Sequence, residues 1–185
     1  AGTAQNVALK QGKVTLSSGA ASAEAGLPGH DSLTLEPQSA GGRILIKNVP
    51  FGVGWWWASA EDRTYESRIE IFPGNNGKLE VVTSLPLEEY LRGVVPTEIG
   101  ADSPLEALKA QAVAARTESM LALMTQKYAG GHYDICSDVE CQAYSGVNKC
   151  NERTDEAVRA TRGIVLLFEG KPISAYYASN CGGHT

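Results

Sequence analysis

The sequence predicts an α+β fold in which small β-hairpins and a sheet pack around one long, alanine-rich helix. Residues 104–128 form a helical pattern, and two later segments each place a turn between apolar runs. Residues 1–42 are rich in Ala, Gly and Ser and contain only short apolar runs. We therefore expect an additional irregular β segment over 1–42 and a main domain over 43–185.

The long helix has the clearest boundaries. Ser103 is a good N-cap, Pro104 suits the first helical position, and Glu106 completes a capping box. The pair Gly130-Gly131 predicts the end of the helix. Five alanines let neighbouring backbones approach closely, so we expect this helix to be buried: Ala107, Ala110, Ala112, Ala114 and Ala115.

The other elements are shorter. Residues 43–47 predict a strand, and 68–82 predict a β-hairpin around the turn at 73–77. A short helix is expected at 87–93, where Gly93 would end it. The remaining predictions are a helix over 151–162 and a second hairpin formed by 164–168 and 173–177.

Three consecutive tryptophans, Trp55 to Trp57, follow a glycine-rich turn. Because side chains alternate along a strand, at least one of them must be exposed or lie on an edge. An exposed tryptophan could stack on a sugar ring, whereas a core or interface position is the interpretation we favour.

Composition excludes several classes of protein. A net charge of −5 argues against nucleic acid as the main partner, because phosphate binding requires basic residues. No apolar run reaches the ~20 residues needed to span a bilayer. The sequence shows no export signal, so such a signal is either already removed or not included. Because the sequence stops in a glycine-rich turn, we expect the domain to continue beyond Thr185.

One carboxylate stands out. Glu98 follows the apolar pair Val94-Val95 and Pro96, a pattern that predicts a turn between two helices. Partial desolvation there would raise its pKa, as a general acid near neutral pH requires. A helix-capping or surface glutamate is the alternative.

Two cations share one face of the long helix, because Lys109 and Arg116 lie seven residues apart. On an apolar face they require a carboxylate such as Glu98, a polar substrate, or water. The alternative is that both side chains extend to the surface.

The cysteines allow two interpretations. His132, Cys136 and Cys141 have spacings that suit a zinc site, with Cys150 nine residues further on. The even number of cysteines favours disulfides among Cys136, Cys141, Cys150 and Cys181 instead. We prefer disulfides and leave a structural zinc ion as the alternative.

From residue 85 onward the chain resembles the SpoIID/LytB family, the stage II sporulation protein D domain. The resemblance rests on the order and spacing of five segments, at residues 87–98, 106–117, 141–146, 157–163 and 175–185. It implies an extracytoplasmic lytic transglycosylase that cleaves the MurNAc–GlcNAc bonds of peptidoglycan glycan strands, preferably peptide-free, to 1,6-anhydroMurNAc products.

The resemblance also implies roles for individual residues. Glu98 would be the catalytic acid and base, and Arg116 an arginine important to activity. The substrate cleft would further include Lys109, Tyr177, Ser179, Gly182 and Gly183. Catalysis would need no cofactor, and any zinc would be structural, although Glu140 replaces an expected histidine ligand. The alternative function is a non-catalytic, peptidoglycan-binding enhancer of a cell-wall amidase.

Overall fold

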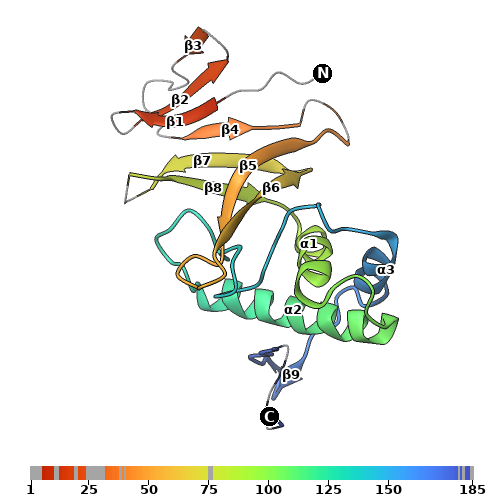
Figure 1. Cartoon of the computed structure of the whole chain (residues 1–185). Coiled ribbons are helices and arrows are strands. Elements are labelled where there is room, and N and C mark those ends of the chain that lie inside the picture. Colours follow the sequence, from red (N-terminus) through yellow and green to blue (C-terminus); the bar gives the residue numbers. More distant parts are fainter. Residues whose placement is uncertain are drawn as a thin grey trace. The chain divides into compact units, whose positions relative to one another are not determined.

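The computed structural model describes residues 6–10, 13–18, 21–23, 32–37, 39, 41–74, 77–178, 180 and 182–183 (Figure 1). It confirms the α+β class. The chain forms two compact units, one of residues 1–44 and 67–84 and the other of residues 45–66 and 85–185. The predicted boundary between an N-terminal segment and a family domain at residue 42 stays a prediction.

The first unit consists of two three-stranded antiparallel sheets. Its strands are β1 (Asn6–Lys10), β2 (Lys13–Ser18), β3 (Ala21–Ala23), β4 (Leu33–Leu35), β7 (Arg68–Pro73) and β8 (Leu79–Ser84), in the orders β1-β2-β3 and β4-β7-β8. Ile69 and Ile71 alternate with polar residues on β7 and are buried, as period-2 patterning predicts. Ile71 pairs with Val81 of β8, which confirms the first predicted hairpin.

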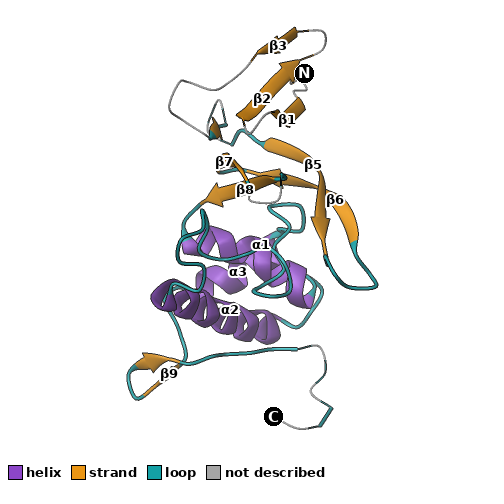
Figure 2. Ribbon diagram, turned by 90° about the vertical axis from the view of Figure 1, so that its left-hand side faces the viewer, coloured by secondary structure: helices purple, strands orange, loops and turns teal. Residues whose placement is uncertain are grey.

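The second unit contains the three helices. Its elements are β5 (Ile44–Phe51, from Leu45 on), β6 (Ser59–Tyr65), α1 (Leu87–Ile99), α2 (Leu105–Thr125), α3 (Glu152–Ala160), β9 (Leu167–Phe168) and β10 (Lys171–Pro172). Both α1 and α3 pack against α2, and Figure 2 shows the three helices grouped together. None of the described helices is both long and apolar enough to cross a bilayer.

Helix α2 is buried along one stripe. Leu108, Ala112 and Ala115 are fully inaccessible to solvent, and the two alanines leave room for the backbones of α1 and α3. The predicted capping box is wrong, because Ser103 donates its hydroxyl to the carbonyl of Ile99 instead of capping α2. The helix ends at Thr125, before the predicted glycines, where Gln126 adopts a left-handed conformation.

Helix α1 is longer than predicted, because Gly93 does not end it. A Cβ atom at this position would lie 2.4 Å from the Tyr144 ring and from the carbonyl oxygen of Gly146. The glycine therefore allows a close approach inside the helix. The extra length carries Glu98 into the last turn of α1, whereas the sequence predicted a turn between helices.

Pro96 lies inside α1 and has no N–H, so it cannot donate to the carbonyl of Arg92 one turn earlier. The thiol of Cys150 donates to that carbonyl instead, at 3.2 Å. Burial raises the pKa of the Cys150 thiol to about 11, so the donor proton is retained at neutral pH. Cys150 thereby satisfies the backbone group that the proline leaves free.

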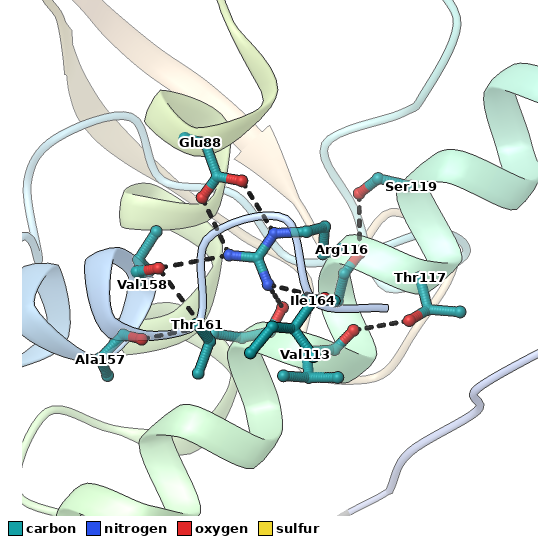
Figure 3. Close-up of polar contacts among 11 residues, drawn as sticks. Glu88, Val113, Arg116, Thr117, Ser119, Ala157, Val158, Thr161 and Ile164 are labelled. Atoms are coloured by element: carbon teal, nitrogen blue, oxygen red, sulfur yellow. Dashed lines mark hydrogen bonds and ion pairs between the residues drawn. The ribbon is translucent and has the colours of Figure 1, made fainter. Parts of the chain in front are cut away.

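Arg116 connects the three helices (Figure 3). Its side chain is only 1% exposed and forms two 2.9 Å hydrogen bonds with the carboxylate of Glu88 on α1. It also donates to the carbonyl of Val158 near the end of α3, at 3.3 Å, and to that of Ile164, at 3.1 Å. A fifth bond, to Ala112, engages the remaining guanidinium hydrogen.

The segments after α2 differ in how well they match prediction. Helix α3 begins with a capping box between Asn151 and Thr154, close to the predicted start. The second hairpin is much shorter than predicted, because only β9 and β10 pair. Upstream of them, the backbone N–H of Leu166 donates to the hydroxyl of Thr117 on α2.

We predict that Arg116→Met lowers the free energy of unfolding by about 3 kcal/mol, because it leaves the partly buried carboxylate of Glu88 without its partner and removes one donor from each of three carbonyls. Arg116→Lys should recover only part of this loss, since an ammonium cannot bind bidentately. Lys109→Met is the matched control on the same helix: its partner Glu106 is 81% exposed, so the cost should stay below about 0.5 kcal/mol. Urea titration measures all three.

The same interaction predicts a pH dependence. Hydrogen bonding to Arg116 lowers the pKa of Glu88, so the stabilisation is present above the ordinary carboxyl pKa. It is lost as the pH falls through the lowered pKa of Glu88. The difference in the free energy of unfolding between the native protein and Arg116→Met should become smaller over that pH range. Equal losses for Arg116→Met and Lys109→Met at pH 7 would contradict the structural role.

A second prediction concerns the proline. Cys150→Ala should cost about 1 kcal/mol by leaving the Arg92 carbonyl without a donor, and Cys150→Ser should cost less. In a Pro96→Ala background the helix regains its own N–H, so the Cys150→Ala cost should shrink. Urea unfolding of the native protein, Cys150→Ala, Pro96→Ala and the double variant forms a double-mutant cycle that tests this, and strict additivity would argue against the bond.

Candidate active site

A pocket of about 460 Å³ lies between the helices and the chain that follows them. The end of α1, the second half of α2, the loop of residues 135–142 and the segment after β10 all contribute to its wall. Its lining residues are Glu98, Glu118, Leu121, Ala122, Thr125, Lys127, Ile135, Val139, Glu140, Cys141, Gln142, Ser174, Tyr176 and Tyr177. The pocket is large enough for a small-molecule or sugar ligand.

Glu98 is half-buried in this pocket, at the end of α1. One of its oxygens, Oε1, accepts a short hydrogen bond from the backbone N–H of Ala143. Burial raises the pKa of the carboxyl, while the bond from Ala143 and the nearby Tyr177 hydroxyl act in the opposite direction. The net shift favours the protonated acid, which is the form that can donate a proton.

The loop that carries Ala143 is firmly held. Gln142 and Tyr144 are buried, and the Tyr144 ring packs against the rings of Tyr65 and Tyr90 with centroids 6.2 and 5.1 Å away. Further on, the N–H of Val147 donates to the carbonyl of Thr64 on β6, at 2.8 Å. The amide that contacts Glu98 is thus fixed before any ligand binds.

A chain of hydrogen bonds leads away from the acid. The Tyr177 hydroxyl donates to Oε1 of Gln142 at 2.9 Å, and Nε2 of Gln142 donates to the Ser119 hydroxyl at 2.9 Å. Ser119 in turn donates to the carbonyl of Ala115 at 2.8 Å. Burial, reinforced by the charge of Glu98, raises the pKa of Tyr177, so this phenol stays protonated.

The pocket contains functional candidates that the sequence reasoning missed. Glu118 adds a second carboxylate to the wall, and its Oε1 atom is buried without a hydrogen-bond partner among the described residues. Gln142 and Ser119 orient Tyr177. One feature of the sequence could have identified them. Glu118 and Ser119 are polar residues that directly follow the alanine-rich, partly buried stretch of the long helix.

Several predicted cleft residues do not line the pocket. Arg116 is the main correction: its guanidinium is buried and bound to Glu88, so it does not pair with Glu98 or face a ligand. Lys109 forms an ion pair with Glu106 at 2.7 Å instead. Gly182 and Gly183 are exposed and lie beyond the lining residues, and Ser179 lies outside the described residues.

The structure describes only part of the predicted cysteine sites. Cys136, Cys141 and Cys150 are free thiols, and Cys181 lies outside the described residues. Cys136 and Cys141 are close neighbours, and the bond from Cys136 lowers the pKa of Cys141. No group of three metal-binding side chains forms within the described part of the chain. Disulfides and a structural zinc ion stay predictions.

Comparisons with known proteins follow the same segments. The model of the family SpoIID, described as stage II sporulation protein, matches residues 75–168. Stage II sporulation protein D of Bacillus amyloliquefaciens is 34% identical over 171 residues, which cover 85% of this chain and 44% of that protein. The amidase enhancer of Bacillus subtilis is 41% identical over 95 residues, covering 51% of this chain and 12% of the relative.

A further relative, an uncharacterized protein of Brachyspira hyodysenteriae, is 41% identical over 111 residues, or 60% of this chain and 30% of that protein. The chain therefore spans less than half of each of these relatives. The family match nevertheless covers α1, α2 and α3 and includes Glu98 and the loop that binds it. The chain belongs to the stage II sporulation protein D (SpoIID) family.

Proposed function

We propose that this chain acts at the bacterial cell wall and cleaves peptidoglycan glycan strands as a lytic transglycosylase, with Glu98 as its acid and base. The observation that carries the proposal is a half-buried carboxyl with a raised pKa, held by a fixed backbone amide on the wall of a pocket. The family membership and the names of the relatives, a sporulation protein and an amidase enhancer, support a cell-wall role.

In the proposed reaction, protonated Glu98 donates its proton to the glycosidic oxygen between MurNAc and GlcNAc. Because the Ala143 N–H occupies Oε1, the other oxygen, Oε2, is available for proton transfer. The Tyr177 hydroxyl can then turn its proton from Gln142 toward the newly formed carboxylate. That carboxylate takes the proton of the muramyl 6-hydroxyl as its oxygen attacks C1, which gives the 1,6-anhydro product.

This route needs one carboxyl, because the substrate's own hydroxyl is the nucleophile and no water is activated. Hydrolytic glycosidases differ in using a pair of carboxylates. Glu118 also lines the pocket, so hydrolysis by two carboxylates is a competing outcome that the products distinguish.

A second candidate function is a non-catalytic enhancer of a cell-wall amidase. It rests on one observation, the 41% identity to the amidase enhancer of Bacillus subtilis over 95 residues. In that case the pocket would bind glycan without cleaving it.

The test is mass spectrometry of the products formed from peptide-free glycan strands. We predict 1,6-anhydromuramyl products from the native protein and at least a 100-fold lower rate from Glu98→Gln, since general acid catalysis contributes about 10²–10⁴-fold. Glu106→Gln is the matched control, because it makes the same change at an exposed carboxyl, and it should keep the native rate.

Other results would contradict the proposal. Reducing-end hydrolysis products that depend on both Glu98 and Glu118 would indicate a two-carboxylate hydrolase. Strand binding without any cleavage, together with faster hydrolysis by an added cell-wall amidase, would indicate the enhancer.

The raised pKa of Glu98 gives a further prediction with a defined sign. A carboxyl whose pKa is raised on folding stabilises the protein at low pH and loses that contribution as the pH rises. Glu98→Gln should therefore unfold at higher urea than the native protein at pH 7, with the difference vanishing below about pH 4. The kcat/KM of the native protein should fall as the pH rises through the raised pKa of Glu98, because the acid then loses its proton. Glu106→Gln should show neither effect.

A further inference from the structure

The connection between β5 and β6 exposes a cluster of large apolar side chains. Val53, Trp55 and Trp56 at this tip (residues 52–58) are 67%, 57% and 93% exposed. The two tryptophan rings are thus exposed to water, although aromatic side chains are among those that gain the most free energy from burial. Such a concentration of exposed aromatic surface indicates a binding site.

The tip has a defined shape. Gly52 has a φ of +62°, and the Trp57 ring lies so close over it that a Cβ atom would be 2.2 Å away. Trp57 in turn stacks on Trp55, with ring centroids 6.4 Å apart and planes 19° apart. Two turn hydrogen bonds, from Trp55 to Gly52 and from Ala58 to Trp55, close the backbone. The backbone of the tip and the Trp55 ring are therefore preorganised.

The tip is attached to the rim of the pocket. The carboxylate of Asp138 accepts hydrogen bonds from the N–H of Gly52, at 3.2 Å, and from that of Val53, at 3.3 Å. The residues that follow Asp138, from Val139 to Gln142, line the pocket that contains Glu98. A polymer that leaves the pocket across this rim would meet the tip next.

The absence of charged side chains at the tip limits the class of ligand that it can bind. Residues 48–60 contain no charged side chain. Aromatic tips that insert into anionic bilayers are accompanied by Lys or Arg, which this segment lacks. A flat, uncharged aromatic surface instead matches the apolar face of a pyranose ring, whose C–H groups can pack on an indole.

We propose that Trp56, with Trp55, forms a sugar-stacking subsite that holds the glycan strand beyond the Glu98 pocket. The subsite rests on the proposed function for its ligand class, a glycan strand of N-acetylated sugars. It predicts a length dependence: strands long enough to cross the rim use the tip, and short fragments that fill only the pocket do not.

Intrinsic fluorescence provides a selective readout, because all three tryptophans of the chain lie in this tip. The assay uses Glu98→Gln, so that no strand is cleaved, and compares long peptide-free glycan strands with a single disaccharide. Long strands should shift the emission and protect it from acrylamide quenching, and the disaccharide should not.

Trp56→Ala in the same background should weaken binding of long strands about tenfold by calorimetry, the loss expected when a central aromatic contact is removed. Its disaccharide affinity should be unchanged. Phe168→Ala is the matched control: this ring is exposed on β9 and does not line the pocket, so long-strand affinity should stay native. Asp138→Ala keeps the rings but removes the tether, and should reduce only long-strand binding.

Native long-strand affinity in Trp56→Ala would overturn the subsite, as would equal losses for long strands and the disaccharide. Binding of the tip to anionic vesicles but not to strands would assign it to a membrane instead. The catalytic proposal is tested independently of the subsite, because anhydro products are measured with the native protein, in which Glu98 is intact. A fluorescence response to strands without such products would keep the subsite and remove the catalysis.

Discussion

The arrangement of the helices depends on one buried cation. Arg116 takes all its donors into the interior, where Glu88 of α1, the Ala112 carbonyl of α2 and the carbonyls within and after α3 accept them. Removing any of these partners would leave a guanidinium hydrogen unpaired in a place that water does not reach. The pair therefore ties the first turn of α1 to α2, and α1 carries Glu98 at its other end. Arg116 itself does not line the pocket.

The same helix contains a second constraint that leads to the acid. A proline in its interior would normally kink or end it, and here a protonated thiol from outside the helix replaces the missing bond. The helix continues for one more turn past Pro96, and this turn places Glu98 against the N–H of Ala143. The position of the acid thus depends on contacts from residues about fifty positions later in the chain.

These long-range contacts explain what the sequence could and could not predict. Period-2 alternation predicted the β7–β8 hairpin, because it is a local pattern. The alanine-rich run predicted a buried helix only in part, since Ala112 and Ala115 are buried whereas Ala110 is exposed. The end of α1 was misplaced because Gly93 is a helix terminator by local rules, whereas here it allows Tyr144 to approach. Glu98 was found as a desolvated carboxyl, but the role of Arg116 was not, since its partner Glu88 is 28 residues away.

The loop of residues 137–148 joins the two halves of the proposed site. Near its start Asp138 holds the tryptophan tip, and further on Ala143 holds the Glu98 carboxyl, with the buried residues Gln142 and Tyr144 on either side of Ala143. Because both attachments are made by residues of one short loop, the distance between the acid and the aromatic surface is set by the fold. A strand held on the tip would therefore be presented to Glu98 in a fixed register, which is how binding remote from the reacting bond can raise the rate of cleavage.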